Sequence, residues 1–485
     1  MIEFVLVGSA VAVMVGLALW RPGIAVMALG VYLFVQSALV RLPGLPDEAT
    51  EVLARADEFV LVALLVRTTA TWLIARDRQL PRPLWALVAF AGIGVVSAFL
   101  NGVGPLAMGL GIFLAVKAGL WLYVGYFLAV DVLVLARYAF LVGSLFVGVV
   151  AIALLQVVGL PLPWAAYTRA GEIAATSIWN FHTAFGGAMS VAVGLSVVAF
   201  RLPGERIGAA VLAVCGVAGV ILSTARRLLA SLAVAAVAVL VALPAETRSG
   251  IRSQLSVLRR PVVLVAIVGA IALGAIVVGP RLVNLAELTW ERYVVNLESR
   301  DRYQLYEGAF RLAQESPLVG RGPATFGSFA SVVVDSPAYD EVGYRRPRAS
   351  MVVGGQIASV FAEYGILGFA AFATFLVLLT RALLQIMRGT RGTIQAALAT
   401  GGVFMVANMV VESFVNPVFS NSFITFFTFV GIGVAMSMHE ASRQAPGVGD
   451  WDAGRISARW RVGTLAAAVL LLAVLGGVAA LATAL

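Results

Sequence analysis

The stretch GIFLAVKAGLWLYVGYFLAV (111–130) decides the fold, because its only charged side chain is Lys117. An apolar run of about 20 residues is long enough to cross the hydrocarbon core of a bilayer as a helix. The chain of 485 residues is 61% hydrophobic and 12% charged, whereas soluble domains average about 25% charged residues. The sequence therefore predicts an all-α polytopic membrane protein with a single transmembrane domain over residues 1–485.

Similar apolar runs recur along the chain and predict about 14 transmembrane helices, within a range of about 12–14. The first run lacks a preceding basic segment and a small-residue cleavage site, so we expect a membrane helix rather than a removed signal peptide. The predicted spans are 3–20, 23–40, 58–75, 84–100, 109–130, 138–158, 181–200, 207–224, 227–244, 262–279, 364–386, 394–412, 420–438 and 463–483.

Arginine placement predicts which loops face the cytoplasm, because basic residues concentrate in cytoplasmic loops. The arginine-containing loops include 76–83, 247–261 and 439–461, and we expect the last to be a cytoplasmic linker before the final helix. The alternate loops are poor in basic residues: 41–57, 101–108, 159–180 and 412–421. Both chain ends and residues 280–350 are then expected on the extracytoplasmic side.

Scarce residue types exclude several kinds of site. The single cysteine, Cys215, allows no intramolecular disulfide. Two histidines, His182 and His439, are too few for a histidine-rich metal site. Every strong base except Lys117 is arginine; a GC-rich genome explains most of this bias, and arginine also binds phosphate through a planar fork. We expect no metal, no cofactor and no nucleic-acid partner.

Residues 280–350 form a long charged segment between two hydrophobic blocks, with nine arginines and nine acidic residues. We expect a large extracytoplasmic loop. Within it, SRDRYQLYEGAFRLAQESP (299–317) predicts an amphipathic helix in which Arg302 and Tyr306 share one face. The apolar stretch 351–363 is too short to span a bilayer and predicts a short re-entrant or interfacial helix.

Several short motifs follow one another in order along the chain. An Arg-x-x-x-aromatic helix precedes Pro-Leu-x-Gly-x-Gly, and Glu-x-Gly-x-x-Gly then opens a membrane helix. This order resembles the O-antigen ligase and polymerase superfamily, and segments 168–184 and 221–231 agree with it, with Ala225 where a serine usually stands. The matching residues are Arg169, Asn180, Arg226, Arg302, Tyr306, Pro317, Gly320, Gly322, Phe326, Glu363, Gly365 and Gly368.

The resemblance implies a specific reaction. Members of this superfamily transfer a glycan from undecaprenyl diphosphate to an acceptor hydroxyl outside the bacterial plasma membrane. The acceptor is another lipid-linked glycan in polymerases and a lipid A core in ligases. The chain would then be a multi-pass glycosyltransferase whose partners are the lipid-linked donor, a glycan or lipid-linked glycan acceptor and the bilayer. Preorganised arginines suit this chemistry, because negative charge grows on the departing diphosphate.

Arginines on the predicted outer side are the first candidates for the site. The resemblance gives Arg226 and Arg302 the role of gripping the diphosphate, with Arg300 as a second choice and Arg169 as a further substrate-binding residue. Each has a simpler alternative. Arg226 can snorkel to the headgroups, Arg302 can form a surface ion pair with Glu298, and Arg169 can be an ordinary loop charge.

Two further basic residues have open roles. Arg227 either snorkels or helps to bind substrate. Lys117 lies inside an apolar span, where a cation is costly and is expected to be functional or paired. It either faces the donor phosphates or pairs with a buried acid, and the sequence favours neither alternative. Tyr306, the aromatic residue of the helical motif, is expected to contact substrate.

The superfamily's usual histidine, shortly before the glutamate of Glu-x-Gly, is missing. Gly354 and Gly355 occupy that part of the chain. His182, Glu363 or Asp301 can substitute as the base, or the acceptor needs no strong base. In the simpler alternatives, His182 is a hydrogen-bonded structural residue and Glu363 caps or orients its helix.

A lipid-linked glycan flippase or another transporter is the alternative function. About fourteen spans suit that class, but transporters typically show two similar halves with interrupted helices. No such halves are evident in the sequence, and a transporter needs no long charged outer loop. We therefore expect an enzyme that acts at the membrane surface.

Overall fold

The computed structural model describes residues 2–41, 44–75, 79–128, 132–157, 167–169, 172–179, 181–202, 205–243, 301–344, 354–389 and 393–444. The predicted span at 262–279, the span at 463–483 and the linker at 439–461 beyond residue 444 lie outside these residues, as does Arg300.

The first half of the chain is helical up to a short hairpin. Its helices are α1 (Ile2–Trp20), α2 (Pro22–Leu39), α3 (Asp47–Ala54), α4 (Ala56–Ala75), α5 (Arg82–Leu100), α6 (Pro105–Phe127) and α7 (Val132–Val157). Strands β1 (Tyr167–Arg169) and β2 (Glu172–Ala174) form an antiparallel hairpin in the segment predicted as a neutral loop. This hairpin is the only β-structure among the described residues.

Helices continue after the hairpin. They are α8 (His182–Arg201), α9 (Arg206–Leu222), α10 (Arg226–Ala242), α13 (Asp301–Glu315), α14 (Phe329–Val333), α15 (Ala338–Glu341), α16 (Gln356–Gly389) and α17 (Ile394–Ser413). The last stretch is irregular: a 3-10 turn, η3 (Val418–Ser420), precedes α18 (Ser422–Thr425), the π-helical segment η4 (Phe426–Val430) and α19 (Gly431–Gln444).

The chain is an α-helical membrane protein. Seven helices of the described part are long and apolar enough to cross a membrane, and four shorter apolar helices accompany them. Helices occupy every predicted span that falls within the described residues. The total of about fourteen spans stays a prediction.

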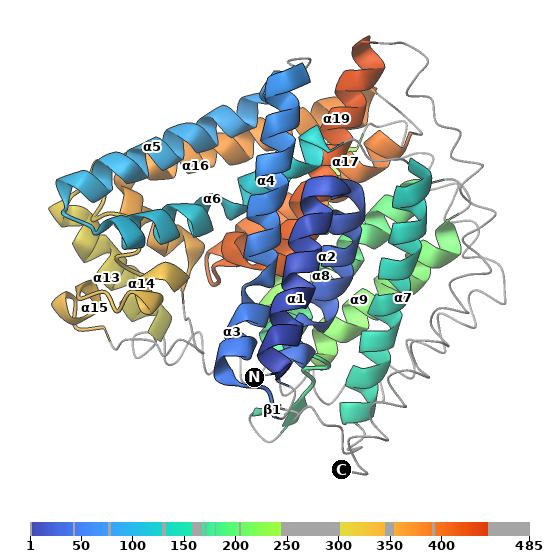
Figure 1. The fold of residues 1–485 in the computed structure, drawn as a ribbon, viewed down its shortest axis with the longest axis horizontal. Coiled ribbons are helices and arrows are strands. Elements are labelled where there is room, and N and C mark those ends of the chain that lie inside the picture. The colour runs from blue at the N-terminus through green and yellow to red at the C-terminus, as the bar shows by residue number, and fades with distance from the viewer. Residues whose placement is uncertain are drawn as a thin grey trace.

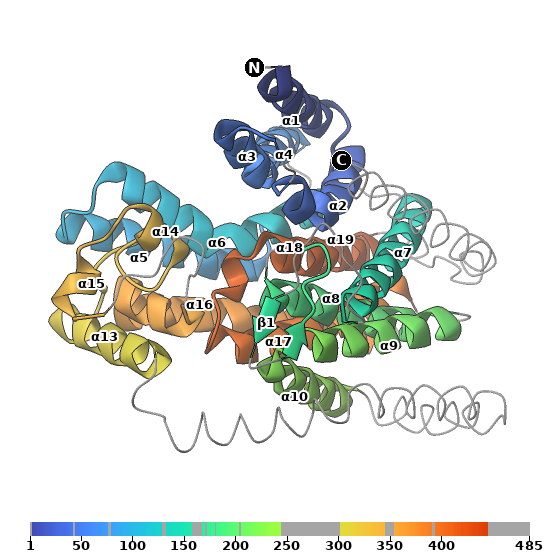
Figure 2. The same ribbon diagram turned by 90° about the horizontal axis from the view of Figure 1, so that it is seen from below.

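The main core lies between helices that are distant in sequence. Phe34 of α2 contacts Phe146 of α7 and Phe423 of α18, with ring centroids 4.8 Å and 4.9 Å apart. Both pairs meet edge to face, the arrangement that aromatic quadrupoles favour. Because α18 packs here, the irregular segment after α17 is held in the middle of the helical bundle (Figure 2).

A smaller core supports the charged loop. Leu305, Ala309 and Leu312 of α13 pack with Phe326, Tyr339 and Ala362. Burial raises the pKa of the Tyr339 hydroxyl, which accepts a hydrogen bond from Gly327 N at 3.0 Å. Both ribbon views show α13, α14 and α15 beside α5, α6 and α16 (Figures 1 and 2). The described part of the loop is therefore a folded unit docked on membrane helices.

Hydrogen bonds join the predicted outer loops at one end of the bundle. Arg41 donates to Ile178 O at 2.8 Å, and Ala175 N donates to Leu222 O at 3.0 Å. Asn101 Nδ2 donates to Gly320 O at 3.0 Å. This end, at the lower edge and lower left of Figure 1, carries α3, the hairpin and α13–α15.

Candidate functional site

The C-terminal end of α17 is a meeting point for polar groups from two helices. Arg227, the second residue of α10, donates from Nε to Glu412 Oε2 at 3.1 Å. Asn416 Nδ2 donates to the same oxygen at 3.0 Å. Glu412 is 2% exposed, and the Arg227 side chain is 18% exposed. A buried carboxylate thus holds an arginine at the N-terminal end of α10.

Two more helices reach the same segment. The Tyr306 hydroxyl of α13 donates to Phe414 O at 2.7 Å. Gln356 N, at the start of α16, donates to Asn416 O at 3.2 Å. A Cβ on Gly355 would lie 2.8 Å from Phe414 O and 3.1 Å from Tyr306 Oη, so a larger residue at 355 would force these elements apart. We call residues 412–416 the α17 end segment.

The predicted diphosphate-binding arginines lie at the starts of two helices that contact this segment. Arg226 is the first residue of α10, directly before Arg227. Arg302 is the second residue of α13, one helical turn before Tyr306. The structure therefore brings the two helix starts that carry Arg226 and Arg302 to one five-residue segment. Arg169 ends β1, whose hairpin leads into Ala175 and its bond to the last residue of α9.

Glu363 is a buried anchor for the glycine-rich loop. It is 2% exposed, and its Oε1 accepts hydrogen bonds from Phe326 N at 3.1 Å and Ser328 Oγ at 2.6 Å. The backbone amides of Ala324 and Thr325 also interact with this carboxylate. These contacts bind the glycine-rich loop, whereas the alternative from the sequence was that Glu363 caps or orients its own helix. A catalytic role for Glu363 stays a prediction.

Helix α16 is broken at Gly365, which has φ 63° and ψ −163°. The break frees backbone groups on both sides, and the loop at 317–322 binds them. Arg321 N and Gly322 N donate to Ala362 O and Glu363 O, each at 2.9 Å. Ile366 N and Leu367 N donate to Pro317 O at 2.9 Å and Leu318 O at 3.0 Å. The Pro-Leu-x-Gly-x-Gly and Glu-x-Gly motifs are thus two halves of one structural unit.

This interlock explains the glycines of both motifs. A Cβ on Gly365 would lie 2.5 Å from Gly320 N and 2.7 Å from Leu318 C, and a Cβ on Gly320 would collide with the backbone of Glu363 and Tyr364. The conformation of Gly365 is one that essentially only glycine adopts. The short helix from Gln356 to the break lies within the predicted segment at 351–363 and the residue after it, and its place relative to lipid stays a prediction.

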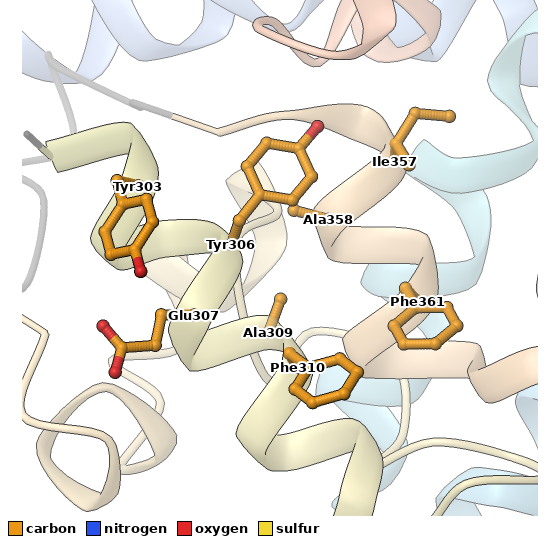
Figure 3. A pocket seen from close by; sticks show the side chains of 8 residues that line it. All are labelled: Tyr303, Tyr306, Glu307, Ala309, Phe310, Ile357, Ala358 and Phe361. Atoms are coloured by element: carbon orange, nitrogen blue, oxygen red, sulfur yellow. The ribbon is translucent and has the colours of Figure 1, made fainter. Parts of the chain in front are cut away.

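A cavity of about 510 Å³ opens between α13 and the first part of α16. Its lining includes the aromatic residues Tyr303, Tyr306, Phe310 and Phe361 and one acid, Glu307 (Figure 3). Pockets with mainly apolar and aromatic walls and a few polar groups are typical small-ligand sites. Tyr306 lines this cavity and also donates to Phe414 O, so the cavity lies beside the α17 end segment.

Lys117 belongs to a separate cluster. It is 1% exposed, and its ammonium nitrogen lies 2.9 Å from Asp57 Oδ2, 3.2 Å from Glu58 Oε1 and 2.8 Å from Ser422 Oγ. An ammonium has three N–H donors, so these partners account for all of them. Of the two roles left open for Lys117, the structure shows the pairing with buried acid. Contact with donor phosphate stays a prediction.

The remaining predicted residue, His182, begins α8 and is partly exposed. No group of three His, Cys, Asp or Glu residues that would hold a metal ion occurs among the described residues.

Sequence reasoning missed the acidic partners. Asp57 was assigned to the loop 41–57, Glu58 began the predicted span 58–75, and Glu412 lay where the span 394–412 meets the loop 412–421. The signal that would have indicated them is an acid at the end of an apolar run, because such a group needs a partner when it is buried. The identity of that partner is not in the sequence: Arg227 and Glu412 are separated by 185 positions.

Comparison with known proteins adds no relative: no family model and no curated protein matches this chain.

Proposed function

We propose that this protein is a membrane glycosyltransferase that moves an oligosaccharide from undecaprenyl diphosphate to an acceptor hydroxyl, as in the superfamily that its motifs resemble. The observation that carries the proposal is the meeting of α10 and α13 at the α17 end segment. Arg227 binds Glu412 there, and Tyr306 binds the backbone of Phe414. These two contacts support a shared role for the helix starts that bear Arg226 and Arg302, because both helices meet residues 412–416.

Glycan transfer from a lipid diphosphate requires cations in fixed positions beside a site that excludes water. As the bond between the sugar and the diphosphate breaks, negative charge grows on the leaving phosphate. Arginines whose positions are set in advance stabilise this charge without having to reorganise. In the proposed mechanism Arg226 and Arg302 bind the diphosphate, and binding of both substrates in line supplies the remaining acceleration by proximity.

The aromatic cavity between α13 and α16 supports a place for the saccharide. Its aromatic rings present apolar faces, and Glu307 supplies a hydrogen-bond acceptor. In this arrangement the glycan lies along α13 while its diphosphate lies at the helix starts. We propose that this end of the bundle is extracytoplasmic in a bacterial plasma membrane, within a bundle of about fourteen spans, and that the acceptor is a second lipid-linked glycan, as in a polymerase, because that reaction needs no other specialised substrate.

The test is transfer by purified protein in lipid, with undecaprenyl-diphosphate oligosaccharide as donor. We expect longer lipid-linked glycan as the product. Arg226→Ala and Arg302→Ala should each lower the turnover about 10²- to 10³-fold, the usual loss for one group that stabilises developing charge. The matched control is Arg55→Ala, which removes an exposed arginine paired with Glu51 on α3. Normal turnover in both site variants would refute the site assignment.

One observation favours a second candidate, a lipid-linked glycan flippase. Helix α16 is broken at Gly365, and the candidate span Ser422–Gln444 contains the π-helical segment Phe426–Val430. Discontinuous helices are common at transporter binding sites. Movement of labelled lipid-linked glycan across vesicles, without formation of a new glycosidic bond, would establish the transporter and exclude the transferase.

A further inference from the structure

The two carboxylate oxygens of Glu412 differ in their hydrogen bonding. Oε2 accepts the hydrogen bonds from Arg227 and Asn416. Oε1 is buried and accepts no hydrogen bond from any residue in the described part of the chain. A buried acceptor without a partner costs free energy that the fold must offset elsewhere. Such a group needs an explanation, and a role in catalysis is one.

The surroundings fix Glu412 firmly. Ser231 of α10 interacts with the same carboxylate, while its hydroxyl donates to Asn408 Oδ1 at 2.8 Å. Asn408 lies one turn before Glu412 on α17 and in turn donates to Ser190 Oγ of α8 at 3.4 Å. Polar side chains from three helices, α8, α10 and α17, therefore hold the Glu412 carboxylate in place. A side chain held in this way keeps its direction when a substrate arrives.

The position of Glu412 also suits a reacting group. It occupies the last turn of α17, two residues before the half-exposed Phe414, whose carbonyl oxygen contacts Tyr306. It is in direct contact with Arg227, the neighbour of Arg226. The buried carboxylate thus contacts the residue next to Arg226, at the helix start where we propose that the diphosphate binds.

We propose that Glu412 is the general base of the transfer, and that its Oε1 takes the proton from the acceptor hydroxyl. This inference rests on the proposed function and deepens it, because the superfamily that the motifs resemble has a histidine where this chain has Gly354 and Gly355. The acceptor oxygen forms a bond to the sugar's anomeric carbon, and the bond from that carbon to the phosphate oxygen breaks. The lipid diphosphate leaves with the bonding electron pair. The proton passes to Glu412 and later to water or to the departed diphosphate.

Arg227 fixes one oxygen of this carboxylate. An arginine beside a buried carboxylate opposes the effect of burial and favours the ionised form, which is the form that accepts a proton. Asn416 binds the same oxygen as Arg227, so both contacts leave Oε1 for the acceptor. Contacts between a base and its substrate often form fully only when the substrate is bound, so the buried Oε1 meets the acceptor in the complex.

The variant Glu412→Gln tests the proposal, since it keeps the shape of the side chain and removes the proton acceptor. We expect transfer to the hydroxyl acceptor to fall about 10²- to 10⁴-fold, the usual contribution of a general base. Binding of the lipid-linked donor, measured on the same preparation, should change little. Should Glu412→Gln fail to fold, Glu412→Asp takes its place, because it retains a carboxylate one methylene shorter and should keep part of the activity.

Azide as an alternative acceptor shows whether Glu412 acts as a base or only positions Arg227. The azide anion is already deprotonated, so its attack on the anomeric carbon needs no base. With azide as acceptor, Glu412→Gln should form glycosyl azide at a rate close to that of the wild type. If transfer to azide and to the hydroxyl acceptor fall by the same factor, Glu412 acts through Arg227 and the proposal is wrong.

The outcomes for the two proposals can be told apart. If wild-type protein makes no product with either acceptor, the proposed transferase function fails. If the wild type makes product and Glu412→Gln transfers normally to the hydroxyl acceptor, the transferase stands and the base assignment fails. Glu51→Gln is the matched control, because it neutralises an acid that is also paired with an arginine but is exposed on α3.

Discussion

Two buried charge clusters in this protein differ in how completely their groups are paired. At Lys117, all three ammonium donors have partners, two of them carboxylates. At Glu412, one carboxylate oxygen is bound twice and the other has no partner in the described structure. A cluster whose polar atoms are all paired has no atom left to bind a ligand, whereas Glu412 Oε1 has no hydrogen bond to a described residue. The difference separates structural charge from candidate functional charge in one apolar bundle.

The largest expected effect on stability comes from breaking the cluster around Lys117. Lys117→Met leaves Asp57 buried without its cation, and removing one partner of a buried ion pair costs about 3–5 kcal/mol. We expect a loss of this size in the free energy of unfolding in detergent. The double variant Lys117→Met/Asp57→Asn should recover part of it, because less unpaired charge remains buried.

Arg55→Met is the control for that measurement. Its pair with Glu51 is exposed, and such pairs contribute about 0–1 kcal/mol. A loss at Lys117 no larger than the loss at Arg55 would show that the buried cluster is not a closed structural unit.

The next largest effect is expected at the break in α16. Gly365→Ala forces a side chain into a glycine-only conformation, at a cost of about 1–3 kcal/mol, and also drives a Cβ against Gly320 and Leu318. We expect lower thermal stability and faster proteolysis of the loop at 317–322. Gly92→Ala on α5 is the control, since no atom lies within 4 Å of its added Cβ. Equal stability of the two variants would contradict the interlock.

The smallest effect is expected at Tyr306, which contacts the α17 end segment near Glu412. Tyr306→Phe removes one hydrogen bond, to Phe414 O, and should lower the free energy of unfolding by about 0.5–1.5 kcal/mol. Glycan transfer should fall by less than in Arg302→Ala, because the phenyl ring still lines the cavity. Transfer unchanged from the wild type would show that the α13 contact with α17 does not matter for the reaction.

The membrane helices were the part of this fold that the sequence predicted best. Long apolar runs such as 111–130 have few alternatives to a helix in lipid, because every backbone group must be satisfied within the segment. The helix at 299–317 was also predictable from its periodicity and its flanking Ser, Asp and Pro. The structure has α13 from Asp301 to Glu315 within that range.

Pairings between distant segments were not predictable from one sequence. The motifs at 317–322 and 363–365 were recognised in order. Their amino-acid sequences do not show that the backbone of the first binds the backbone groups freed by the break at Gly365. The β1–β2 hairpin and α3 arise in loops without long apolar runs, where contacts with neighbours decide the local structure. The site is similar: Arg226 and Arg302 were chosen from motifs, whereas Glu412 became a candidate only through its contact with Arg227.

The most direct test of the account is to find where the lipid diphosphate binds. A photoreactive undecaprenyl-diphosphate analogue, activated on the wild-type protein in lipid, should attach to the starts of α10 and α13 and to residues 412–416, and competing donor should suppress these adducts. Adducts confined to α4 and α6 around Lys117, with none at the α17 end segment, would contradict the account.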